Sequence, residues 1–92
     1  MCVTLIGGID RLKSDYMAAA HEHGCQLKCI SRNERNFVDK IGNPDQMIVF
    51  TNKISHEAKR KAVQVARSRK IPLFMIHSCG VSSLRECLRR PS

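Results

Sequence analysis

Small and polar side chains follow each of several short apolar runs, and these clusters hold the residues that could do chemistry. Gly7 and Gly8 come directly after the first apolar run, with Arg11 just beyond them. A glycine turn that opens a helix presents free backbone N–H groups to an anion, and an arginine can add a bidentate contact. The three-glycine dinucleotide motif is absent, so a plain tight turn is the alternative for these residues.

A second polar cluster follows the apolar run of residues 47–50. It comprises Thr51, Asn52, Lys53, Ser55 and His56. A group of this polarity directly after a buried strand indicates a ligand site. The alternative is that the hydroxyl and amide groups satisfy loop and helix-cap hydrogen bonds, with His56 exposed in the first helical turn.

A third cluster follows the apolar run of residues 73–76. It comprises His77, Ser78, Cys79, Gly80, Ser82 and Ser83. A run of small and hydroxyl residues before a helix is typical of an anion-binding nest. His77 and Cys79 are also candidate ligands for a metal or haem. For a single histidine at a strand end, an ordinary hydrogen bond is the alternative.

Alternating apolar and helical patterns predict the elements that must position these clusters. Strands are expected at residues 2–6, 25–30, 47–50 and 73–76. Helices are expected from Asp10 to Gly24, weakly through residues 37–41, and from Ser55 to Pro72. A last helix follows from the capping-box spacing of Ser83 and Glu86.

Strands alternating with helices predict an α/β fold, a small three-layer α/β/α domain that spans residues 1–92 as a single domain. The expected sheet has four parallel strands in the order 2-1-3-4, with right-handed crossovers. Parallel strands end at one edge, and the order reverses between the first and third strands, where such sheets bind ligands. The three clusters should therefore meet at that edge.

The charge distribution suggests an anionic partner. The net charge is +8, and residues 51–92 carry ten basic against two acidic side chains, whereas residues 1–50 are balanced. Such asymmetry favours a small anionic ligand and also permits nucleic-acid binding, although few aromatic residues are present for stacking on bases. A solvated basic helix face is the alternative.

Five cysteines without a secretory signal are typical of a cytoplasmic protein with reduced thiols. No apolar run is long enough to span a membrane, so no membrane partner is expected. Cys29, Cys79 and His77 form the candidate metal or redox set. No set of nucleophile, base and orienting residue is present, so we expect a binding module rather than an enzyme.

The Gly7-Gly8 turn with Arg11, the stretch from Thr51 to His56 and the segment 78–84 together resemble a family of small bacterial proteins, the domain-of-unknown-function family 2325. The likeness runs along nearly the whole chain. It implies a Rossmann-like or flavodoxin-like half domain, a homodimer, and haem binding as in some members. The resemblance also implies an anionic cofactor near Arg11, His56 and residues 80–83.

One departure from that pattern concerns the second strand. Relatives associated with haem have histidines after this strand, where this chain has Cys29, Ile30 and Ser31, so Cys29 would have to replace the ligand. The leading hypothesis is a non-enzymatic, dimeric cytoplasmic module that binds an anionic small molecule or cofactor, with haem the most specific candidate. The alternatives are a cysteine and histidine switch and a nucleic-acid-binding module.

Overall fold

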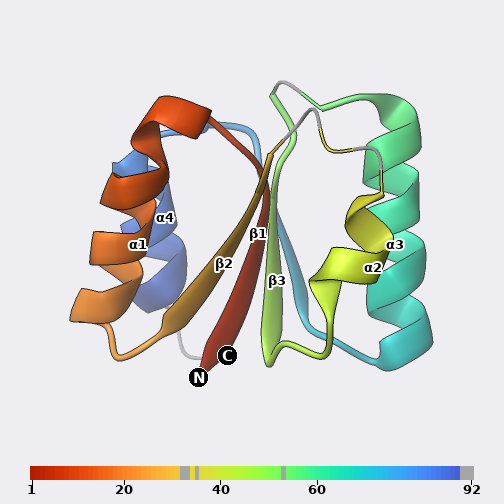
Figure 1. Ribbon diagram of the computed structural model, residues 1–92, viewed down its shortest axis with the longest axis horizontal. Coiled ribbons are helices and arrows are strands. Elements are labelled where there is room, and N and C mark those ends of the chain that lie inside the picture. The colour runs from red at the N-terminus through yellow and green to blue at the C-terminus, as the bar shows by residue number, and fades with distance from the viewer. Residues whose placement is uncertain (32–33, 35, 53, 90–92) are drawn as a thin grey trace.

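The computed structural model describes residues 1–31, 34, 36–52 and 54–89. Strands and helices alternate along the chain. In chain order they are β1 (Cys2–Gly8), a 3-10 turn (Asp10–Leu12), α1 (Lys13–Glu22), β2 (Gln26–Ser31), α2 (Phe37–Ile41), β3 (Gln46–Phe50), α3 (His56–Arg69), β4 (Leu73–Ile76) and α4 (Val81–Arg89). Figure 1 shows the strands between two pairs of helices.

The four strands form one parallel sheet in the order β2-β1-β3-β4, which confirms the predicted architecture. β1 and β3 lie inside the sheet, and every residue of β3 is buried. A strand covered on both faces needs a continuous apolar sequence, which explains the uninterrupted run in β3. The order reverses between β1 and β3, so the predicted switch point is also confirmed.

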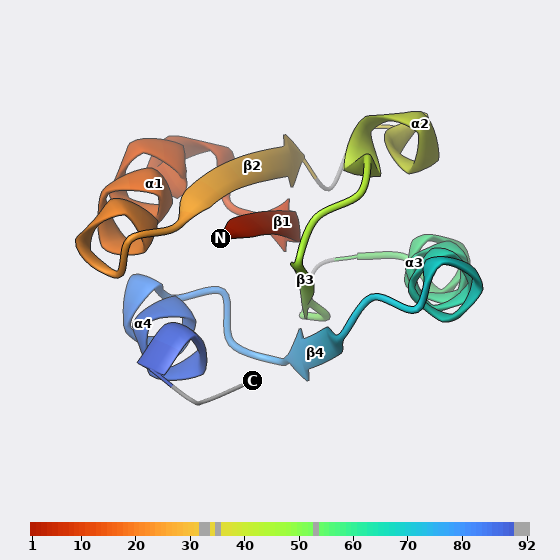
Figure 2. The same cartoon turned by 90° about the horizontal axis from the view of Figure 1, so that it is seen from below.

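The helices cover the sheet as two layers with separate cores. Figure 2 shows α1 and α4 on one face and α2 and α3 on the other. Strand residues alternate between the faces, so Leu5 and Ile48 pack with α1 and α4, whereas Ile6 and Val49 pack with α2 and α3. Each crossover is right-handed because twisted strands and right-handed helices pack back onto a sheet only in that sense.

Two helix starts differ from the sequence prediction. Asp10 was expected to cap the first helix, but the chain makes a 3-10 turn at residues 10–12 and α1 begins at Lys13. The last helix begins at Val81, so Ser83 lies inside α4 and the capping box at Ser83 and Glu86 was wrong. In both places the loop packs against the core, and this packing determines where the helix begins more strongly than one capping residue does.

The helix bounds also bear on the expected absence of a membrane segment. Within the part of the chain that the structure describes, no helix combines the length and the apolar character needed to cross a bilayer.

Candidate functional site

The loops that follow β1, β3 and β4 meet at the carboxyl edge of the sheet, as parallel strands require. The backbone N–H of Thr51 donates to the carbonyl of Ile76 at 2.9 Å, which joins the ends of β3 and β4. The thiol of Cys79 lies 4.0 Å from the carbonyl oxygen of Gly7. The three predicted clusters therefore lie at one edge of the sheet. Whether a ligand can bind there depends on how much of that edge the side chains leave open.

Packing fills the space around the Gly7-Gly8 turn. Gly7 has a φ of +85°, and a Cβ there would lie 2.7 Å from the carbonyl oxygen of Phe50 and still closer to the side chain of Ile54. A Cβ on Gly8 would lie 2.8 Å from the ring of Tyr16. These glycines permit close approach of neighbouring groups, so the alternative of a tight turn explains both without a ligand.

Tyr16 of α1 closes this turn with its hydroxyl group. The hydroxyl accepts from the backbone N–H of Ile9 at 3.2 Å and donates to the carbonyl oxygen of Cys79. Its ring packs against Phe50, with centroids 5.6 Å apart. Burial raises the pKa of Tyr16, although the bond from Ile9 opposes this. The Tyr16 hydroxyl thus occupies the backbone N–H of Ile9, a donor that an anion at this turn would need.

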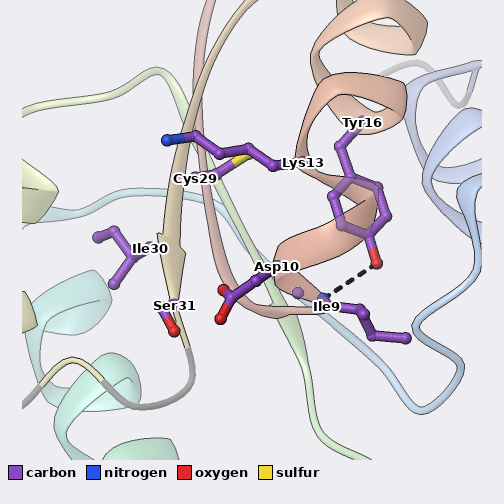
Figure 3. Close-up of a pocket in the computed structure, with 8 residues that line it drawn as sticks. Ile9, Asp10, Lys13, Tyr16, Cys29, Ile30 and Ser31 are labelled. Carbon is purple, nitrogen blue, oxygen red and sulfur yellow. Dashed lines mark hydrogen bonds between the residues drawn. The ribbon is translucent and has the colours of Figure 1, made fainter.

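A small cavity remains between the ends of β1 and β2 (Figure 3). It measures about 80 Å³ and is lined by Gly8, Ile9, Asp10, Lys13, Tyr16, Cys29, Ile30 and Ser31. Burial raises the pKa of Cys29, and the charge of Lys13 partly counteracts the shift. A raised pKa does not suit a reactive thiolate.

The third cluster begins α4 without forming an anion nest. The hydroxyl of Ser78 accepts from the backbone N–H of Gly80 at 3.3 Å, so one donor of the expected nest is occupied. Ser82 and Ser83 lie beside Glu86 in a hollow of about 370 Å³, where a carboxylate disfavours an anion. His77 is exposed at the end of β4.

The second cluster divides into capping and exposed residues. Ser55 caps α3, since its hydroxyl accepts from the backbone N–H of Ala58 at 3.1 Å, which confirms the expected helix start. Asn52 is exposed and Thr51 is half-buried. His56 is exposed in the first turn of α3, while Lys53 lies outside the described residues.

The first turns of α3 carry a wide, shallow hollow with basic walls. It measures about 470 Å³ and is lined by His56, Lys59, Arg60 and Val63. Glu57, the acidic residue of this turn, instead pairs with Lys61 at 3.2 Å. Among the described residues, neither Lys59 nor Arg60 has an ion-pair partner. We call this surface the α3 hollow.

The predicted metal set is not brought together within one chain. Cys79 is buried, and Cys29 lines a cavity that His77 does not reach. The described residues contain no group of three or more histidine, cysteine, aspartate or glutamate side chains that could hold a metal ion. Arg11 is exposed in the 3-10 turn and lines neither the small cavity nor the α3 hollow.

Comparison with known proteins decides the family. The model of the bacterial family described as "Uncharacterized protein conserved in bacteria (DUF2325)" matches residues 2–90. The chain belongs to the DUF2325 family. No curated protein matches it.

Two solved structures similar to this DUF2325 chain are de novo designs. One designed Rossmann fold protein is 13% identical, with a TM-score of 0.66, and the alignment covers 96% of this chain and 93% of that one. A designed Rossmann 2x2 protein, solved by NMR, is 12% identical, with a TM-score of 0.60 and coverage of 97% and 84%. At these identities the likeness establishes the Rossmann-like fold alone.

Sequence reasoning missed several residues that shape this edge in the DUF2325 chain. Tyr16 was not singled out from the sequence, yet its hydroxyl joins two loops. A signal was available, because a buried tyrosine needs a hydrogen-bond partner. Lys59 and Arg60 were not singled out from the sequence; among the described residues, Glu57 forms its ion pair with Lys61, and neither Lys59 nor Arg60 has an ion-pair partner.

Proposed function

We propose that this protein is a non-enzymatic module that binds a small anionic molecule in the α3 hollow. The observation that carries the proposal is the pair of cations, Lys59 and Arg60, beside His56 in a hollow of about 470 Å³. The N-terminal end of a helix adds positive potential at the same place, since backbone dipoles align along the axis. Together these groups favour a negatively charged ligand over a neutral one.

The shape of the α3 hollow indicates what kind of anion suits it. Ligand pockets commonly enclose about 300–1,000 Å³, so the hollow has room for more than an inorganic ion. Lys59 and Arg60 suit phosphate or carboxylate groups, and Val63 offers a small apolar contact. We therefore propose an organic molecule with one phosphorylated or carboxylated end.

Haem fits this chain only in part. The cavity beside Cys29 has about 80 Å³, too little for a porphyrin, and Cys79 is buried with its thiol directed at Gly7. Of the predicted haem ligands, His56 lines the α3 hollow of about 470 Å³, with Lys59 and Arg60 beside it as partners for propionates. Hemin therefore serves as one probe of the α3 hollow, with His56 as its candidate ligand.

Nucleic-acid binding would use the same basic surface, but the aromatic residues do not support it. Tyr16, Phe37 and Phe50 are buried, and Phe74 is half-buried. Proteins that bind single strands stack bases on exposed aromatic rings, and the chain presents none. The unpaired cations therefore favour a small ligand over a polynucleotide.

The first experiment measures binding of inorganic tripolyphosphate by calorimetry at low ionic strength. Lys59→Ala/Arg60→Ala should weaken binding at least about tenfold, because two charged hydrogen-bond donors are lost. Lys13→Ala/Lys28→Ala is the matched control, since it removes the same charge from exposed positions outside the α3 hollow. Equal loss in both variants would show that only net charge attracts the probe and would refute the α3 hollow as a site.

The second experiment tests the haem version with hemin. A Soret shift should depend on His56, so His56→Ala should remove it, whereas His77→Ala should leave it in place. A shift that persists in His56→Ala would show that this histidine is not the ligand.

A further inference from the structure

The two edges of the sheet differ in how they are protected against pairing with another strand. β2 forms one edge and carries the exposed Lys28 in its middle. β4 forms the other edge, and its sequence, Leu73 to Ile76, contains no charged residue. A charge on an edge strand prevents association, and an apolar edge strand without one is open to pairing.

Among the described residues, no strand pairs with the outer side of β4. The carbonyls of Pro72 and Ile76 accept from the N–H groups of Met47 and Thr51, each at 2.9 Å. Backbone groups of a parallel strand alternate in direction, so those of Leu73 and Met75 point away from β3. Met75 is also 47% exposed, although it is a large apolar residue.

These features suit a second copy of the same chain. If two β4 strands run antiparallel with the two-fold axis at Met75, the two Met75 residues exchange both N–H···O bonds. Leu73 of each copy then lies opposite His77 of the other. The two sheets continue as one, and the exposed Met75 side chains cover each other.

The same arrangement brings the two α3 hollows together. Ala62 and Ala66 of α3 face the sheet, so Lys59 and Val63 lie a quarter turn to one side. Because α3 is right-handed, its direction relative to the strands puts this flank on the side of the β4 edge. Figure 2 shows α2 beside the other flank of α3. Met75 shares a sheet face with Leu73, which packs in the α2 and α3 layer. Both hollows therefore open onto one groove with the Met75 pair as its floor.

We infer that two copies of this chain pair through β4 and that an anionic ligand held between their α3 helices stabilises the dimer. This inference rests on the proposed anion binding. The Lys59 side chains of the two copies carry like charges on facing flanks of the groove, and an anion between them removes their repulsion. Binding and dimerisation therefore strengthen each other, since a coupling free energy is reciprocal.

The test is sedimentation of the whole chain over a range of protein concentrations, with and without tripolyphosphate. The wild type should dimerise more tightly with the probe. Met75→Lys should weaken the dimer by more than about a hundredfold, because it places like charges together at the axis. Met17→Lys is the matched control, since Met17 of α1 is similarly exposed, at 45%, and adds the same charge elsewhere.

The outcomes separate this inference from the proposed function. A Met75→Lys protein that is folded, monomeric and still binds tripolyphosphate supports both. A wild type that binds the probe as a monomer at every concentration overturns the inference and leaves the anion site intact. A Met75→Lys dimer as tight as wild type overturns pairing through β4. A wild type that dimerises through β4 without binding the probe overturns both the coupling and the proposed function.

Discussion

The turn that follows β1 and the first turns of α3 differ in whether the protein's own side chains fill the space beside them. Beside β1, Tyr16 and Ile54 occupy the space above the glycine turn, and about 80 Å³ remains. Beside α3, Lys59 and Arg60 border a hollow of about 470 Å³. Small residues after a strand can therefore serve packing alone, whereas cations without a partner indicate better where an anion binds.

Substitution of Gly7, in the turn after β1, should give the largest loss of unfolding free energy. Gly7→Ala places a methyl group 2.7 Å from the Phe50 carbonyl at a φ of +85°, so unfolding free energy should fall by about 3 kcal/mol or more. Gly24→Ala is the control, because Gly24 has a φ of +70° but no neighbour within 4 Å. It should cost about 1 kcal/mol. Equal losses in urea denaturation would show that the turn is open after all.

Tyr16→Phe should have a smaller effect. The variant keeps the ring against Phe50 but leaves the N–H of Ile9 and the carbonyl of Cys79 without their partner. Stability should fall by about 1–3 kcal/mol, the cost of unsatisfied buried polar groups. Denaturation of the variant at neutral pH measures this loss, and an unchanged midpoint would contradict the bridging role of the hydroxyl.

The pH dependence of stability should give the smallest and most specific signal. Burial raises the pKa of Tyr16 in the folded state above its ordinary value near 10. The contribution of the buried, protonated Tyr16 to the free energy of unfolding is complete below the unfolded-state pKa. It is lost as pH rises through the folded-state pKa. The wild type should therefore lose more stability above about pH 10 than Tyr16→Phe does. Parallel profiles for the two proteins would refute this account.

The fold was predictable because the apolar runs and the alternation of strands with helices indicate the same arrangement. The buried run at residues 47–50 has the pattern of an interior parallel strand, and alternation with helices leaves few topologies. β4 lies at residues 73–76, the range that the apolar run predicts. Helix starts were less predictable, since α4 begins at Val81 and not at the predicted capping residue Ser83.

The site was predictable only to the level of the edge. Parallel strands bring the ends of β1, β3 and β4 together, and the structure confirms this convergence. Sequence could not show that Ile54 would press on Gly7, because that contact depends on the path of one loop. Nor could it show which cations of α3 stay unpaired, since that depends on the flank on which each residue lies.

The most direct test of the account follows backbone amide shifts by NMR as tripolyphosphate is added. Binding in the α3 hollow predicts that the largest shift changes fall at residues 56–63, with little change at Gly7, Gly8 and Tyr16. Changes centred on the Gly7-Gly8 turn would contradict binding in the α3 hollow, because they would place the anion where the side chains of Tyr16 and Ile54 fill the space.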